Sequence, residues 1–166
     1  MSRELALEVG SSINPLIDKL RKDLLPENPF FLGLELHPEW LIAIKNKKPS
    51  YLENYSGVIV QGDVLHAPIA TGSASVILMK EVLGEFKNYR ILRKEIVRIC
   101  KTTGYVVVVE SVMPEINKRQ NVDKFFENIG FGLVEGYTGH KVNKVFNKLF
   151  LTFSKIDFAL VFQKSN

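Results

Sequence analysis

The sequence predicts an α/β fold in which helices cover both faces of a mainly parallel β-sheet. Short apolar runs typical of buried strands alternate along the chain with segments whose apolar residues repeat at helical spacing. The run 105–109, Tyr-Val-Val-Val-Val, is especially rich in β-branched residues, as expected of a central strand covered on both sides. Such alternation implies right-handed crossovers between parallel strands.

Length and composition place the chain among ordinary folded proteins. Its 166 residues allow one hydrophobic core, so we expect a single domain over residues 1–166. Apolar residues make up 46% and charged residues 24% of the chain, which excludes a disordered or disulfide-stapled class. No stretch reaches the roughly 18 apolar residues of a membrane span. The first residues lack the pattern of a signal peptide, so we predict a cytoplasmic protein.

Apolar spacing and turn residues divide the first half of the chain into five elements. The apolar residues between positions 13 and 24 repeat at helical spacing, and Pro15 lies where a first helical turn tolerates proline. Pro38 opens a second helix. In chain order we expect a strand over 4–9, a helix over 13–24, a strand over 30–36, a helix over 38–47 and a strand over 57–61.

The second half continues the alternation. Leu92, Ile96 and Ile99 share the inward face of a predicted helix that includes Cys100, and Gly104 is a suitable helix stop. A single cysteine cannot form an internal disulfide, so Cys100 is expected to pack in the core. In chain order we expect a strand over 76–79, a helix over 89–101, a strand over 105–109, a helix over 122–129, and strands over 133–137 and 158–163.

A basic segment lies near 138–155, where we expect a helical insert. It contains no acidic residue, and its apolar residues repeat at helical spacing. Such a helix could contact the phosphates of a nucleic acid or an anionic membrane surface, or its lysines could form a solvated face over a core-facing stripe. The net charge of +4 permits an acidic partner without requiring one. The lysines are Lys141, Lys144, Lys148 and Lys155.

Three expected strands end in residues suited to ligand contacts, and ligands of parallel sheets bind beyond the carboxyl ends of the strands. The first strand ends at Glu8-Val9-Gly10-Ser11-Ser12. There a glycine lets the backbone pass close to a ligand, and the following helix presents free N–H groups. A plain turn between strand and helix is the alternative.

Two carboxylates close the next two strands. Glu35 interrupts an apolar run and could accept two hydrogen bonds from a ribose diol, or instead form a salt bridge or cap the helix at Pro38. Asp63, after Gly62, could face an exocyclic amine, or lie in a common turn. The three histidines are scattered, with no acids or cysteines at metal-ligand spacing, so we predict no metal site.

Together these segments resemble the class I S-adenosylmethionine-dependent methyltransferases over nearly the whole chain. The resemblance implies a Rossmann-like, seven-stranded, mainly parallel sheet with an antiparallel last strand, and methyl transfer from S-adenosylmethionine to an unidentified acceptor. It is carried by Leu5–Gly10, Gly33–Leu41, Gly62–Val64 followed by Pro68, Ser73–Leu83 and Leu92–Glu110.

The resemblance also implies a set of cofactor-binding residues. Gly10 and Ser11 would lie along the methionine part, and Glu35 would bind the ribose. Asp63 with Val64 would meet the adenine, and Lys80 would border the methyl donor and the substrate. Three further residues complete the expected set: Glu8, Ser12 and Leu36. No catalytic residue is predicted, because in-line methyl transfer depends mainly on alignment of donor and acceptor.

The glycine-rich loop departs from the family pattern, since only Gly10 of its three alternating glycines is present, and Ser75 replaces the usual acid before the fourth strand. The loop does not fit the G-x-G-x-x-G of dinucleotide-binding dehydrogenases. Two alternatives to an active enzyme remain: a catalytically inactive binding or partner subunit, and a nucleic-acid-binding module that uses the basic helix. The first strand begins near the first residue, so we expect an open substrate side that a protein partner, a homodimer contact or a large substrate could cover.

Overall fold

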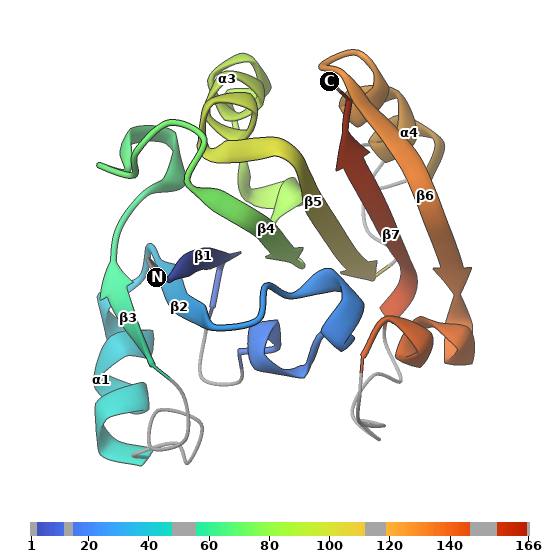
Figure 1. The fold of residues 1–166 in the computed structure, drawn as a ribbon. Helices are drawn as coiled ribbons and strands as arrows, with labels where there is room; N and C mark the ends of the chain where they lie inside the picture. The colour runs from blue at the N-terminus through green and yellow to red at the C-terminus, as the bar shows by residue number, and fades with distance from the viewer. Residues whose placement is uncertain (1–2, 12–14, 48–55, 112–118, 147–155, 166) are drawn as a thin grey trace.

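The computed structural model describes residues 3–11, 15–47, 56–111, 119–146 and 156–165, and the expected seven-stranded sheet runs through it (Figure 1). The strands lie in the order β3-β2-β1-β4-β5-β7-β6. The first five pair in parallel, whereas β7 is antiparallel to both β5 and β6. The bounds are β1 Glu4–Val9, β2 Pro29–Glu35, β3 Gly57–Gln61, β4 Ala74–Lys80, β5 Cys100–Ser111, β6 Phe131–Thr138 and β7 Ile156–Lys164.

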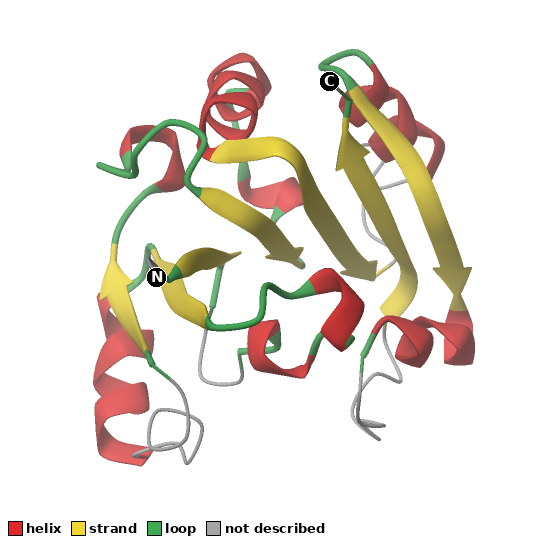
Figure 2. Ribbon diagram, viewed as in Figure 1, coloured by secondary structure: helices red, strands yellow, loops and turns green. Residues whose placement is uncertain are grey.

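Within the described part of the chain, three α-helices occur close to where the sequence predicted them, and shorter 3₁₀ segments fill several of the other connections (Figure 2). The α-helices are α1 Pro38–Lys47, α3 Tyr89–Ile99 and α4 Arg119–Glu127. The 3₁₀ segments are η1 Ile17–Lys19, η2 Lys22–Leu24, η3 Val64–His66, η4 Leu83–Glu85 and η6 Gly139–Val145. Within the described ranges, no helix has the length and apolar character to cross a membrane.

The sheet is covered differently on its two faces. Successive strand residues point to opposite faces, so neighbours such as Val106 and Val107 belong to different core clusters. One cluster contains buried side chains of α3 and α4, including Phe126, whose ring stacks on Phe162 of β7 at 4.6 Å between centroids. The other cluster is closed by the apolar residues of η1, η2 and η6 and the residues beside them. Among described residues, this second face is therefore covered largely by 3₁₀ segments.

The predicted helix over 13–24 is wrong. The chain forms the two short turns η1 and η2 instead, and residues 12–14 lie outside the described residues. The backbone N–H groups of Leu16 and Ile17 donate to the carboxylate of Glu8. At Leu20 the backbone leaves the helical conformation, with ψ of 152°. The apolar spacing did predict burial correctly, because Leu16, Ile17, Leu20 and Leu24 are all buried.

The basic segment agrees with its prediction only in part. Its described portion, η6, is a 3₁₀ helix rather than an α-helix, and residues 147–155 with Lys148 and Lys155 lie outside the described residues. Val142 and Val145 are buried, whereas Lys141 and Lys144 are exposed. The described lysines thus form the solvated side of an apolar stripe.

The predicted place of Cys100 in a helix is also wrong. Helix α3 ends at Ile99, and Cys100 is its C-cap and the first residue of β5. Gly104 lies inside β5 and does not stop the helix. A Cβ at Gly104 would lie 2.9 Å from Sγ of Cys100, so the backbone at Gly104 passes close to the thiol. Cys100 is buried, as the sequence predicted.

Candidate functional site

A cavity of about 310 Å³ lies at the carboxyl ends of β1, β2 and β3. This size is within the roughly 300–1,000 Å³ of small-molecule sites. The strand order runs one way from β1 to β3 and the other way from β1 to β5, so the cavity lies at the switch point where open α/β sheets bind ligands. The lining residues are Val9 and Gly10, Leu34 to His37, Gly62 to Leu65, Val82, and Glu85 to Asn88.

Gly10 forms the turn at the end of β1. Its φ of +72° is a left-handed conformation that glycine adopts without the penalty of other residues. The N–H groups of Gly10 and Ser11 both donate to the carbonyl oxygen of Leu34, at 2.9 and 3.2 Å. A Cβ at Gly10 would overlap Cγ1 of Val82. Gly10 therefore lets the segment after β4 pack directly against the first turn.

Glu35 closes β2 and is only 4% exposed. Its Oε1 accepts a hydrogen bond from the backbone N–H of His37 at 3.0 Å, so the carboxylate holds the start of the β2–α1 connection. Its carbonyl oxygen accepts from the N–H of Gly62 at 3.0 Å, which ties the ends of β2 and β3 together. Glu35 also lines the cavity, so its side chain lies beside the space where a ligand would bind.

Asp63 caps η3 at the adjacent strand end. Its Oδ1 accepts from the N–H of Leu65 at 2.9 Å, and its Oδ2 lies 3.3 Å from Nδ1 of His66, whose side chain is 73% exposed. The Asp63 side chain itself is 36% exposed. Val64, the next residue, is buried, so the turn presents a carboxylate beside an apolar wall.

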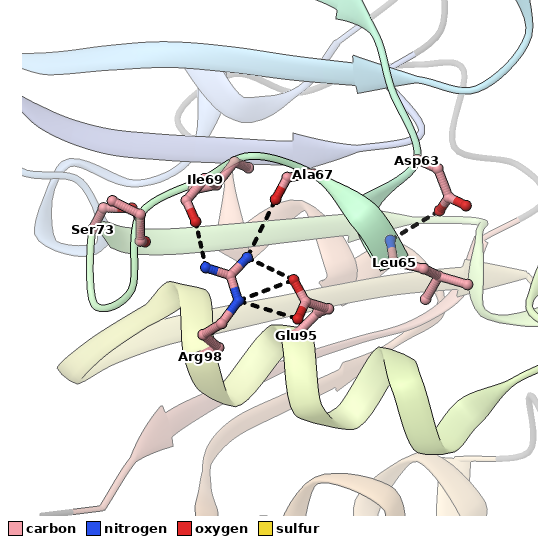
Figure 3. A network of polar contacts seen from close by, with 8 residues as sticks. Asp63, Leu65, Ala67, Ile69, Ser73, Glu95 and Arg98 are labelled. Carbon is pink, nitrogen blue, oxygen red and sulfur yellow. Dashed lines mark hydrogen bonds and ion pairs between the residues drawn. The ribbon is translucent and has the colours of Figure 1, made fainter.

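An arginine fixes the chain that follows η3 (Figure 3). Arg98 of α3 donates to the carbonyl oxygens of Ile69 and Ala67, the latter at 3.3 Å. Its guanidinium also pairs with Glu95 at 2.6 Å, and this hydrogen bonding raises the pKa of Arg98. The guanidinium therefore anchors the segment between η3 and β4 to helix α3.

The nine predicted cofactor-binding residues separate into two groups. Those that line the cavity are Gly10, Glu35, Leu36, Asp63 and Val64. Ser12 lies outside the described residues, and the other three, Glu8, Ser11 and Lys80, are not among the residues described as lining the cavity. For all nine residues, a part in cofactor binding stays a prediction.

Glu8, Ser11 and Lys80 have other surroundings. Glu8 is fully buried, its carboxylate accepts from Leu16 N at 2.9 and 3.1 Å and from Ile17 N at 2.9 Å, and burial raises its pKa to about 8. Oγ of Ser11 is buried without a hydrogen-bond partner in the described structure, 2.5 Å from where a Cβ of Gly33 would lie. Lys80 is the last residue of β4.

Sequence reasoning missed one wall of the cavity and the residue beneath it. Val82 and residues 85–88 line the cavity from the segment after β4. Glu110 of β5 is only 1% exposed, and its Oε1 accepts from the N–H groups of Val82 and Leu83, at 3.0 Å each. Burial raises the pKa of Glu110 to about 7. An acid closing an apolar strand was the signal used for Glu35, and Glu110 carries it too.

A comparison with protein-family models places these features in a known family. A model described as "Methyltransferase domain" matches residues 7–108. The chain belongs to this methyltransferase-domain family. Its membership, together with the similar structures below, indicates S-adenosylmethionine as the cofactor. No curated protein matches the sequence.

Solved structures of low sequence identity share the fold of this methyltransferase domain. A SAM-dependent methyltransferase from Aquifex aeolicus is 13% identical, with a TM-score of 0.68 over 96% of this chain and 81% of that one. One from Methanosarcina mazei is 10% identical, with a TM-score of 0.69 over 99% and 94%. A TehB-like SAM-dependent methyltransferase from Corynebacterium glutamicum is 16% identical, with a TM-score of 0.66 over 100% and 83%.

Proposed function

We propose that this protein transfers the methyl group of S-adenosylmethionine to an acceptor at the carboxyl edge of its sheet. The observation that carries the proposal is the meeting of Gly10, Glu35 and Asp63, from three separate strand ends, around one cavity. Family membership supports the same activity. The acceptor is unidentified, and a cytoplasmic location stays a prediction.

The residues around the cavity fit the cofactor by their chemistry. In the proposal, Glu35 accepts hydrogen bonds from the hydroxyl groups of the ribose, because it lines the cavity at the end of β2 and a carboxylate is an acceptor for such groups. Asp63 faces the exocyclic amine of adenine while Val64 packs against the ring. The backbone turn at Gly10, which lines the cavity, lies along the methionine part.

The chain contributes to the reaction mainly through position and exclusion of water. When bound, the cofactor supplies a methyl group on a sulfonium, which is a good leaving group. Val9, Val82 and Phe86 give the cavity an apolar lining, which keeps water from the reacting groups. Alignment of a bound donor with its acceptor supplies most of the rate in such a displacement. A general base is required only for acceptors that must lose a proton.

Calorimetry with S-adenosylmethionine and S-adenosylhomocysteine tests the proposal. We expect Glu35→Ala to weaken binding at least tenfold, because a hydrogen bond to a charged group contributes about 1.5–3 kcal/mol and tenfold corresponds to about 1.4 kcal/mol. Glu39→Ala is the matched control, since Glu39 lies four residues away on α1 with its side chain 67% exposed. NAD serves as a ligand control and should not bind. Absence of binding by the unmodified chain, or equal losses in both variants, contradicts the proposal.

A further inference from the structure

The segment after β4 is held against the sheet by a set of directed hydrogen bonds. It begins with Glu81, whose φ is +50° and whose N–H donates to the carbonyl oxygen of Val109 at 2.8 Å. The next two N–H groups, those of Val82 and Leu83, converge on one oxygen of Glu110. Three consecutive amides of the segment are thus bound by the end of β5.

Leu83 is held from its other side as well. Its carbonyl oxygen accepts a hydrogen bond from the hydroxyl of Tyr89 at 2.7 Å, and its side chain is 2% exposed. Tyr89 begins helix α3, which is part of the core. Leu83 is therefore fixed through its N–H by β5 and through its C=O by α3, which makes it the anchor of the segment.

The wall of the cavity continues directly from this anchor. Val82 packs against Gly10 and lines the cavity, and residues 85–88 line it further along. We infer that Glu110 is a positioning residue for cofactor binding, and that its carboxylate holds Val82 and the segment after it in place as one wall of the cofactor cavity. The inference rests on the proposed function for the identity of the ligand.

The ionised form of Glu110 holds this wall more firmly than the protonated form. Hydrogen bonds to a charged acceptor are roughly twice as strong as neutral ones. Burial raises the pKa of Glu110 most, and the negative charges of Glu81 and Glu85 raise it further. Burial raises the pKa of the nearby Tyr89 phenol, and the charge of Glu110 raises it further. With a pKa of about 7, Glu110 changes charge close to neutral pH.

Two substitutions separate the acceptor atom from its charge. Glu110→Gln keeps a carbonyl oxygen for both amides and removes the titration, whereas Glu110→Ala removes the acceptor. Val107→Ala is the control for general loss of stability, because Val107 is buried in the same strand but belongs to the cluster on the other face. Calorimetry with S-adenosylhomocysteine at several pH values, and hydrogen exchange of the Val82 and Leu83 amides, are the two readouts.

We expect the affinity of the unmodified chain to fall several-fold as the pH drops from about 8 to about 6, with the change centred near the pKa of Glu110. Glu110→Gln should remove this pH dependence, and its affinity should stay near the low-pH value. Glu110→Ala should bind roughly tenfold more weakly than Glu110→Gln at every pH and should exchange both amides faster. Val107→Ala should change neither readout.

The outcomes distinguish this inference from the proposed function. Unchanged exchange of Val82 and Leu83 in Glu110→Ala overturns the inference, whether or not the protein binds the cofactor. Faster exchange with unchanged affinity overturns it as well, and leaves the proposed function standing. Failure of the unmodified chain to bind overturns both the proposed function and the inferred part of Glu110 in cofactor binding, while the exchange data still decide whether Glu110 holds the segment.

Discussion

Glu8 should make the stability of this protein fall as the pH rises, and Glu8→Gln should remove that dependence. The carboxylate is fully buried, and burial raises its pKa from 4.5 to about 8 despite the hydrogen bonds from Ile17 and Leu16 and the attraction of Lys80, which lower it. The folded state therefore binds a proton that the unfolded chain has released between these two values. Stability from this group is fully present below about pH 4.5 and is lost as the pH rises through about 8.

The size of the effect follows from the shift. At about 1.36 kcal/mol for each pKa unit, raising the pKa from 4.5 to about 8 corresponds to roughly 5 kcal/mol between the two ends of the range. That is a large fraction of the about 5–15 kcal/mol by which domains are stable. Glu8→Gln keeps a carbonyl acceptor for Leu16 and Ile17 but cannot ionise. We therefore expect it to be more stable than the unmodified protein at alkaline pH.

Urea unfolding followed by circular dichroism, at pH values from about 5 to about 9, measures this dependence. Glu110 contributes a slope of the same sign up to its pKa of about 7, so the difference between the unmodified protein and Glu8→Gln isolates Glu8. Glu39→Gln, an exposed acid on α1, is the control. Parallel profiles of unfolding free energy against pH for the unmodified protein and Glu8→Gln would refute the reasoning. So would a stability difference between the two proteins that grows toward acid pH.

Four further outcomes are expected. Gly10→Ala should cost at least about 1–2 kcal/mol in urea unfolding, because φ of +72° is strained for alanine and the new Cβ would overlap Val82; an unchanged midpoint would contradict this. Phe126→Ala should cost about 3–5 kcal/mol, since the ring is fully buried in the core, and a loss under 1 kcal/mol would be inconsistent with that packing. Arg98→Met should speed hydrogen exchange in residues 67–73, because the Arg98 side chain binds the carbonyl oxygens of Ala67 and Ile69, without affecting α4. Cys100, whose pKa is raised to about 11 by burial, should resist iodoacetamide until the chain unfolds, and rapid labelling of the folded protein would disprove its burial.

The strands could be predicted from the sequence because strands covered on both faces are continuous apolar runs. Residues 105–109 and 158–162 are of this kind, and they form the middle of β5 and β7. The backbone conformation in the range 13–24 could not be predicted correctly, because apolar spacing specifies which residues are buried and not how the backbone folds. The backbone N–H groups of Leu16 and Ile17 donate to the carboxylate of Glu8, which lies eight and nine positions earlier in the sequence. No local pattern indicates that contact.

The site was predictable where a polar residue interrupts an apolar strand. Glu35 was singled out in this way and Asp63 from the Gly-Asp pair after the third strand; both line the cavity, and their part in cofactor binding stays a prediction. The wall formed by Val82 and Phe86 was missed because apolar residues after a strand look like ordinary core. Glu110, like Glu35, is an acid that follows an apolar strand. Its hydrogen-bond partners are 27 and 28 positions away in sequence, so only the structure shows that it binds the segment after β4.

The position of β7 has a consequence for how the polypeptide reaches this arrangement. β7 is the last strand in the chain, yet it lies between β5 and β6 and pairs with both. During synthesis β6 therefore emerges from the ribosome with no strand to join, and must wait for residues made about twenty or more positions later. We therefore expect β6, at the right of the sheet in Figure 1, to join the sheet only after β7 has been made and can pair with it.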